Sequence, residues 1–464
     1  MIASTLCCGV LAAAAETPKT FHPEPPPTPL AERESPYGMT WFHTIDDEVK
    51  TRSMLQTLAD MGARQPLALI YWWRWDTKGI EYESMGYRPG DMDEAYRRAL
   101  DYYVNISVEL GLQPCFRVGS FRVFKGLYHK ADPTGSVEPY AEWLTMLAER
   151  YRGKVRVWMM GDEENRGYPF GWTGDPDDYM NKFFIAAATA VRKGDPDALI
   201  GTGSVSSAPA THWLLDVIER GLPKYADGVS GNFAYPVIES RHEMEDMIRR
   251  IRKVWPECRF FGHNGYAENL HGTHDSRQAG ITAQSMFISW DLGWDSVAYY
   301  LYLFSKTADT RQNYGLLKSF GENGGPPEVT DAWRAYQTIA HTFYDRSKLK
   351  KPDFNISIRQ SDRLETEDGF SFTLAPTEAE LKCFIRADRQ LLIYLACPRF
   401  NEPREGRWDI LVETPSWGDP RRIPLLNYTK RESVSHHREN ETLVIENVKA
   451  GLEPAIFTLR KKKR

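Results

Sequence analysis

Three consecutive acidic residues follow an apolar run in the first half of this sequence of 464 residues. The run in 155-VRVWMMGDEENRGYPFGW-172 is followed by Asp162, Glu163, Glu164 and then Asn165. A carboxyl group that loses part of its hydration has a raised pKa, and it can then act as a general acid near neutral pH. The alternative is that these acids cap the next helix or line a solvated loop. The residues alone leave both interpretations open.

Aromatic residues come directly after the acidic group and are frequent in the whole chain. The sequence contains 14 Trp and 23 Tyr, two residue types whose polar tips favour an interface or a wet cleft. Tyr168, Phe170 and Trp172 could form walls on which a sugar ring stacks. The composition therefore points toward a carbohydrate ligand, with a Trp-rich core as the equally weighted alternative.

The acidic group lies in a region where short apolar runs alternate with amphipathic stretches. The expected strands are 37–42, 67–73, 112–118, 155–160, 198–203, 227–232, 258–263 and 297–304. Helical periodicity lies between them, for example in 178–194, where Asp177 or Asp178 is the expected N-cap and Gly194 the expected C′ residue. Eight strands, each followed by a helix, are typical of a (β/α)8 barrel. A doubly wound sheet is the alternative, but the Gly-rich phosphate loop of such sheets is missing.

The pattern changes after about residue 345. Short strands separated by turn residues are expected at 369–376, 381–387, 390–398, 408–415, 442–448 and 455–461. They predict an all-β module of the sandwich type. We therefore expect a barrel over 37–345 and a β-sandwich over 350–464. Because the sandwich has no cluster of ligand-binding residue types, a structural role is favoured over sugar binding.

The N-terminal segments indicate export. Residues 1–15 form an apolar run that ends in alanines, as a secretory signal peptide does, although the positive start is missing, as in a truncated signal. Residues 16–36 form a Pro-rich spacer. We therefore expect a secreted or periplasmic protein. No run reaches the roughly 18 apolar residues of a membrane span.

Charge and cysteine content argue against a nucleic-acid-binding protein and against a disulfide scaffold. The net charge is -5 and the pI about 6.2, which disfavours nucleic acid as a partner. Four cysteines follow the expected signal, which is too few for a disulfide scaffold, although Cys383 and Cys397 could pair across neighbouring strands.

His263, His271 and His274 fit no sharp zinc motif, so we expect neither a metal nor another cofactor. The oligomeric state is left open.

The segment 158–201 resembles the strand-four region of the clan A glycoside hydrolases, especially family 39. There a W-x-x-G-N-E-P-N turn precedes W-x-G, P-x-x-Y, a helix and a K-x-x-D-P-x-A run. The resemblance places Asp162 at the family's Asn, Glu163 at its acid/base Glu and Asn165 at the trailing Asn. It implies a barrel that hydrolyses glycosidic bonds of a polysaccharide or oligosaccharide, with Glu163 as general acid/base.

Other landmarks of the family follow in order along the chain. Trp172, Gly174, Pro176 and Tyr179 hold the positions after the turn. Arg74 ends the second expected strand, where the family keeps an Arg that hydrogen-bonds the nucleophile. Tyr235 matches the family's His-x-Tyr-Pro run, in which Phe233 replaces the His. A wider set of side chains gives candidate substrate contacts, although several of the aromatic ones are expected to belong to the core. They are Trp72, Trp73, Arg74, Asn165, Tyr168, Trp172, Tyr235, His263 and Tyr300.

The sequence departs from the family at the end of strand seven. His263 and Asn264 stand where the family has Thr and its nucleophilic Glu, and an amide cannot form a glycosyl-ester intermediate. Three explanations remain. A second acid could act instead, and the candidates are Glu268, Asp275, Asp76 and Asp162. Asn264 could orient an acetamido group of the substrate as internal nucleophile. Finally, the barrel could bind carbohydrate without cutting it.

Overall fold

The structure is a computed structural model of the chain, and the description below is confined to part of its residues. The described residues are 34–41, 48–70, 92–119, 137–161, 163–166, 175–205, 210–231, 238–263, 276–299, 315–319, 328–360, 364–365, 371–372, 379–386, 390–397 and 406–462.

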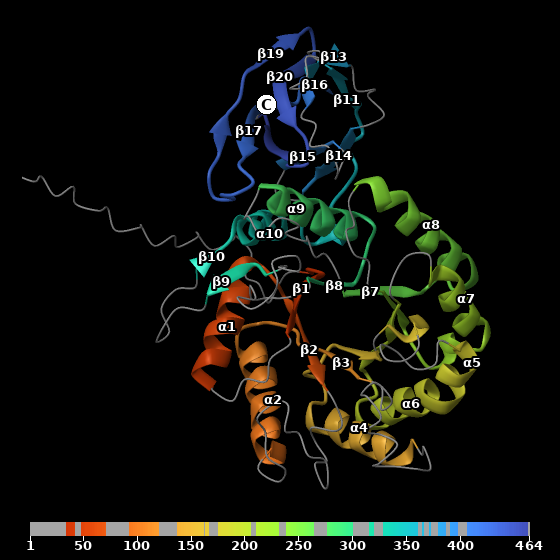
Figure 1. The fold of residues 1–464 in the computed structure, drawn as a ribbon. Coiled ribbons are helices and arrows are strands. Elements are labelled where there is room, and N and C mark those ends of the chain that lie inside the picture. Colours follow the sequence, from red (N-terminus) through yellow and green to blue (C-terminus); the bar gives the residue numbers. More distant parts are fainter. Residues whose placement is uncertain are drawn as a thin grey trace, which may run out of the picture.

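Eight parallel strands close into a barrel in chain order, and β8 pairs with β1 to complete it (Figure 1). The strands are β1 (Tyr37–Trp41), β2 (Gln65–Ile70), β3 (Cys115–Val118), β4 (Val157–Met160), β5 (Leu199–Val205), β6 (Gly228–Gly231), β7 (Arg259–His263) and β8 (Ser296–Tyr299). The predicted (β/α)8 barrel is therefore confirmed, with strand ends that differ from expectation by a few residues.

Helices surround the barrel on its outside (Figure 1). They are α1 (Glu48–Met61), α2 (Met92–Glu109), α4 (Glu138–Arg150), α5 (Pro176–Tyr179), α6 (Ile185–Gly194), α7 (Thr211–Glu219), α8 (Ile238–Val254), α9 (Ser276–Asp291) and α10 (Asp331–Thr342). A π-helical turn, η5 (Met180–Phe184), joins α5 to α6, and short 3-10 turns include η4 (Glu164–Arg166), η7 (Leu222–Lys224) and η10 (Arg346–Lys348).

The two expected ends of the helical segment after strand four were wrong. The N-cap is Asp175, whose side chain accepts a hydrogen bond from the backbone N–H of Asp177, and Pro176 takes the first helical position. Gly194 is the last residue of α6 rather than a left-handed C′ residue. A Cβ there would lie 2.5 Å from the carbonyl oxygen of Thr145 in α4. The glycine is needed because α4 and α6 approach each other closely.

The described tryptophans belong mainly to the core. Nine of the 14 are buried: Trp143, Trp158, Trp213, Trp255, Trp290, Trp294, Trp333, Trp408 and Trp417. Apolar packing therefore explains most of the unusual Trp content. A separate small cluster fills the inside of the barrel and consists of Leu67, Cys115, Val157, Met159, Phe261 and Ala298.

The C-terminal module is built from two antiparallel sheets. One has the order β11-β16-β20-β19 and the other β14-β15-β21-β17-β18. These strands are β11 (Ile356–Gln360), β14 (Glu380–Ile385), β15 (Gln390–Ala396), β16 (Gly406–Glu413), β17 (Trp417–Ile423), β18 (Glu432–Ser433), β19 (His436–Glu439), β20 (Thr442–Ala450) and β21 (Ala455–Lys461). An apolar core that includes Trp408 and Phe457 lies between the sheets, and the predicted β-sandwich is confirmed.

The remaining strands form two short pairs, and the described cysteines of the module form no disulfide. The pairs are β9 (Leu317–Ser319) with β10 (Glu328–Val329), and β12 (Leu364–Glu365) with β13 (Ser371–Phe372). The possible Cys383–Cys397 disulfide was wrong, because neither cysteine takes part in a disulfide. Cys383 lies opposite Ile393 on β15, whereas Cys397 follows the end of that strand.

The sandwich packs on α9 and α10 of the barrel (Figure 1). The rings of Phe287 and Tyr394 stack across the junction with centroids 3.5 Å apart. Gln284 of α9 donates a hydrogen bond of 3.0 Å to the carbonyl oxygen of Leu452. The two parts are thus joined by both apolar and polar contacts.

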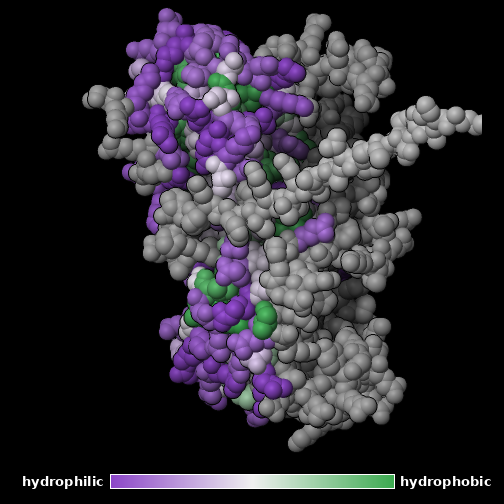
Figure 2. Space-filling view, turned by 90° about the vertical axis from the view of Figure 1, so that its left-hand side faces the viewer, coloured by the Kyte–Doolittle hydropathy of each residue, from purple (hydrophilic) through white to green (hydrophobic). Residues whose placement is uncertain are grey.

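Large apolar side chains are scattered on the described surface. Figure 2 shows a mainly hydrophilic face over the sandwich. The exposed large apolar residues of the described segments are Val49, Val108, Met146, Val254 and Leu426, on different elements. Isolated apolar residues of this kind need no binding partner. Within the described segments, no helix has the length and hydropathy to cross a membrane.

Candidate active site

The turn after β4 has a constrained backbone. Gly161 has φ +103°, and Glu163, two residues later, has φ +46°. A positive φ is uncommon for a residue with a side chain and is found where the surroundings enforce it. Glycine is required at 161 because a Cβ would also collide with the carboxyl group of Glu164. The chain therefore turns sharply at the rim of the barrel and presents two glutamates in different directions.

Glu163 is held through its backbone and its carboxylate. Its N–H donates a hydrogen bond of 3.2 Å to Oγ of Ser204 on β5. Arg166 donates from Nη1 to Oε2 of Glu163 at 2.9 Å, and the Glu163 side chain is 20% exposed. The carboxylate therefore lies at the C-terminal end of β4, is partly buried and forms an ion pair with Arg166. Barrels of this type use side chains at that end for chemistry.

A bulge in the neighbouring strand helps to place Ser204. The pairing of β5 with β6 shifts register between Gly201 and Ser204, and such shifts re-aim side chains near the ends of strands. Ser204 was not identified from the sequence. The only signal was a run of small residues, 201-GTGSV-205, at the end of an expected strand.

Glu164 points away from solvent and is fully buried. Its side chain packs against Gly161, and a Cβ on Gly203 of β5 would lie 2.5 Å from its Cγ. Two glycines therefore make room for a buried carboxyl group between the ends of β4 and β5. The sequence placed Glu163 and Glu164 in one acidic group, and the structure separates them by burial.

Tyr179 joins the same two strands. Its hydroxyl donates to the carbonyl oxygen of Met160 and accepts from the N–H of Gly203, both at 2.8 Å. Burial, with a smaller contribution from the charge of Glu164, raises the pKa of this hydroxyl well above its usual value, so Tyr179 stays neutral. The landmark tyrosine of the P-x-x-Y run thus closes the gap between β4 and β5 beneath the turn.

A buried arginine lies inside the barrel. Arg117 of β3 is fully buried and lies on the same face of the strand as Cys115, which belongs to the interior cluster. Its register partner on β4 is Met159, one residue before the end of that strand. Sequence reasoning missed Arg117, although a charged residue within the apolar run 112-LQPCFRV-118 was a usable signal.

The structure describes two further predicted site residues, Asn165 and the backbone of His263. Asn165 lies in η4 beside Glu164 and is partly buried. The backbone of His263 ends β7, and because the strands are parallel this end shares the rim with the turn after β4. The other expected site residues lie outside the described residues: Trp72, Trp73, Arg74, Asp76, Asp162, Tyr168, Trp172, Tyr235, Asn264, Glu268, Asp275 and Tyr300. The distance from Glu163 to a second carboxylate therefore stays a prediction.

Metal binding finds no support among the described side chains. Within those segments no three His, Cys, Asp or Glu residues lie close enough to share an ion. His271 and His274 lie outside the described residues.

The fold is that of known glycoside hydrolases, while the sequence is far from them. No family model matches the chain, and no curated protein matches it. A family 39 glycoside hydrolase from the gut symbiont Bacteroides cellulosilyticus WH2 has a similar structure, with TM-score 0.60, 15% identity, and coverage of 93% of this chain and 82% of that one.

Two further solved structures give the same result. For a family 39 β-xylosidase from Caulobacter crescentus the TM-score is 0.52 at 12% identity, covering 95% of this chain and 98% of that one. For a family 51 α-L-arabinofuranosidase from Bifidobacterium longum the TM-score is 0.54 at 11% identity, covering 92% and 96%. At these identities the similarity establishes a shared fold, a (β/α)8 barrel with a β-rich module.

Proposed function

We propose that the protein is an O-glycosyl hydrolase that acts on a polysaccharide or oligosaccharide, with Glu163 as general acid/base. The observation that carries the proposal is the geometry of Glu163. Its carboxylate lies at the C-terminal end of β4, 20% exposed, on a turn with φ +46° that Ser204 helps to hold. Solved proteins of similar fold are named as glycoside hydrolases, which supports the same reaction class.

In the proposed reaction, the protonated Glu163 transfers its proton to the glycosidic oxygen while the bond from that oxygen to the anomeric carbon breaks. The leaving sugar departs as an alcohol, and Glu163 remains as a carboxylate. Arg166, 2.9 Å away, stabilises that charged form. A water molecule then adds to the anomeric carbon and loses a proton to a base, which completes hydrolysis.

The second acid is proposed to come from loops at the same rim. A second acid is needed because Asn264 cannot act as the nucleophile. Glu268 and Asp162 are the preferred candidates for it. If the second carboxyl group lies farther from Glu163 than about 5.5 Å, water fits between them and the anomeric configuration inverts. An acetamido group of the substrate, oriented by Asn264, is the other proposed route to hydrolysis.

A panel of polysaccharides and aryl glycosides tests this proposal. Wild type, Glu163→Gln and Glu257→Gln would be incubated with each substrate, and released sugars would be measured by chromatography. Glu257 is an exposed residue in the loop before β7, at the other end of the barrel, so its variant is a matched control. We expect products from wild type and Glu257→Gln, and a loss of about 10² to 10⁴-fold for Glu163→Gln. Equal activity of all three proteins would contradict the role of Glu163.

The alternative function is a catalytically inactive barrel that binds carbohydrate. The observation in its favour is Asn264 at the end of strand seven, where the resembling family carries its nucleophile. Glycan binding by wild type and Glu163→Gln alike, with no sugar released by either, would establish this alternative. We further propose that residues 1–15 direct export, which N-terminal sequencing of protein secreted from its native cells would test.

A further inference from the structure

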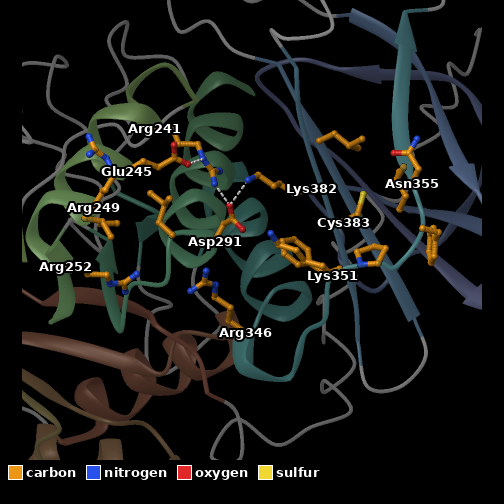
Figure 3. Close-up of a pocket in the computed structure, with 17 residues that line it drawn as sticks. Arg241, Glu245, Arg249, Arg252, Asp291, Arg346, Lys351, Asn355, Lys382 and Cys383 are labelled. Atoms are coloured by element: carbon orange, nitrogen blue, oxygen red, sulfur yellow. Dashed lines mark hydrogen bonds and ion pairs between the residues drawn. The ribbon is translucent and has the colours of Figure 1, made fainter. Parts of the chain in front are cut away.

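A second region rich in charge lies between α8, α9, η10 and β14. It is a cavity of about 720 Å³, drawn in Figure 3. The cations that line it are Arg241, Arg249, Arg252, Arg346, Lys351 and Lys382, and the anions are Glu245 and Asp291. The cavity runs along α8 from Arg241 to Arg252 and adjoins the end of α9, which leads into the start of β8. None of its lining residues belongs to the turn after β4.

Part of this positive charge is neutralised within the protein. Arg241 forms ion pairs with Asp291, Glu380 and Glu245. Lys382 adds a 3.1 Å ion pair to Asp291. These pairs join α8 and α9 to β14 and fix one wall of the cavity.

Three other cations have no such partner. Among the described residues, Arg252, Arg346 and Lys351 form no ion pair. Arg252 lies over the ring of Phe260, 5.2 Å from its centroid. The guanidinium of Arg346 lies against Gly293, where a Cβ would collide with it. Figure 3 shows Arg252 and Arg346 reaching from two elements toward the same space.

Arg346 has one carboxylate and two other arginines as charged neighbours. Desolvation lowers the pKa of its guanidinium, the charge of Asp291 opposes this shift, and the charges of Arg252 and Arg241 add to it. A bound oxyanion would relieve the repulsion between these arginines. A guanidinium can also give such a group two parallel hydrogen bonds.

A neighbouring cavity under the barrel extends the basic surface. It measures about 810 Å³ and shares Asp291, Arg346, Lys351 and Phe384 with the first. It adds Arg64 and Arg156, which precede β2 and β4, and the carboxylates of Glu34 and Asp295. The shared residues Arg346 and Lys351 therefore lie where the two cavities meet.

We propose that Arg252, Arg346 and Lys351 form a binding site for an oxyanion-bearing ligand, meaning a compound with carboxylate, sulfate or phosphate groups. The cavity volume lies within the range of about 300 to 1,000 Å³ of small-molecule sites, enough for one or two sugar-sized units. The site shares no residue with the turn after β4, so it can exist whether or not the protein is a hydrolase.

Isothermal titration calorimetry at constant ionic strength tests the proposal and separates the ligand sources. The probes are sodium sulfate, sodium phosphate, digalacturonate as a dicarboxylate sugar, a sulfated chondroitin disaccharide, and cellobiose as a neutral control. We expect saturable binding of at least one anionic probe at one site per chain and none of cellobiose. Tighter binding of an acidic disaccharide than of inorganic ions would identify an acidic saccharide as ligand, and the reverse would identify a free oxyanion.

Variants assign the binding to these residues. Arg346→Gln and Arg252→Gln should each weaken binding about tenfold through loss of a charge-assisted hydrogen bond. Arg250→Gln is the matched control, because Arg250 lies on the same helix and lines neither cavity. Thermal melting would verify that each variant is folded. Absence of binding by every anionic probe, or equal affinity of Arg346→Gln, Arg252→Gln and Arg250→Gln, would overturn the proposal.

Discussion

Two regions of this molecule combine arginine with carboxylates, and they differ in how firmly the charges are held. At the junction with the sandwich, Arg241 is 11% exposed and contacts Asp291, Glu245 and Glu380. At the rim, Arg166 is 47% exposed and forms an ion pair with Glu163. Several partners, two of them largely buried, fix a structure, whereas an exposed ion pair can exchange with a substrate. We therefore expect the junction to contribute mainly to stability and the proposed chemistry to lie at the rim.

The largest effect on stability is expected from Arg241→Met. Removing the cation leaves Asp291 and Glu380 buried without their main partner, which costs about 3 to 5 kcal/mol. Arg249→Met on the same helix is the control, because Arg249 is 76% exposed, and its change should stay below about 0.5 kcal/mol. Urea unfolding measures both. A loss in Arg241→Met no larger than in the control would contradict a structural role for the junction.

The next largest effect is expected from Gly203→Ala at the rim. The new Cβ would lie 2.5 Å from Cγ of Glu164 and 2.6 Å from the carbonyl oxygen of Met160. Such overpacking costs about 1 to 3 kcal/mol, and relief of the clash would displace the turn that carries Glu163. Denaturant unfolding and glycosidase assays should both show a loss. A fully stable and fully active variant would mean that the space beside Glu164 is not tightly filled.

Ser204→Ala should affect activity more than stability. The change removes the acceptor for the N–H of Glu163, worth about 0.5 to 1.5 kcal/mol, and loosens the placement of the carboxylate. We expect kcat to fall about tenfold, with KM little changed. Ser230→Ala is a matched control, since this buried serine on β6 contacts the sulfur of Met159 and not Glu163. Equal kcat values for the two variants would refute a positioning role for Ser204.

The smallest effect on stability is expected from lowering the pH. Burial alone would raise the pKa of Asp291, but Arg241 and Lys382 hold it below its usual value. Burial raises the pKa of Glu380, so Glu380 takes up a proton first as the pH falls. The stability that Asp291 contributes is present above its unfolded pKa of about 3.9 and is lost as the pH falls through its lower folded pKa. Stability measured from pH 6 to pH 2.5 should fall less steeply below about pH 4 in Asp291→Asn than in wild type. Identical slopes would contradict this linkage.

The sequence predicted the fold well because periodicity reports directly on which faces are buried. Eight apolar runs separated by helical periodicity predicted the barrel, and short strands separated by turn residues predicted the sandwich. It also placed Glu163 at the end of β4 by local spacing. The sequence did not show that Glu164 is buried while Glu163 is partly exposed. The burial of Glu164 depends on Gly203, which is 39 positions farther along the chain. Ser204 was missed for the same reason, since only the pairing of β5 with β4 brings it near the N–H of Glu163. Arg117 was missed although its charge within an apolar run was a usable signal.

Leaving-group dependence tests the central claim most directly. Wild type and Glu163→Gln would be compared on aryl glycosides with dinitrophenol, nitrophenol and phenol leaving groups, using a sugar identified in the substrate panel. A general acid matters most when the departing oxygen is strongly basic. If Glu163 is that acid, the rate ratio of wild type to variant should be small for dinitrophenol and should rise steadily toward phenol. A ratio that stays constant across the series would contradict the assignment of Glu163.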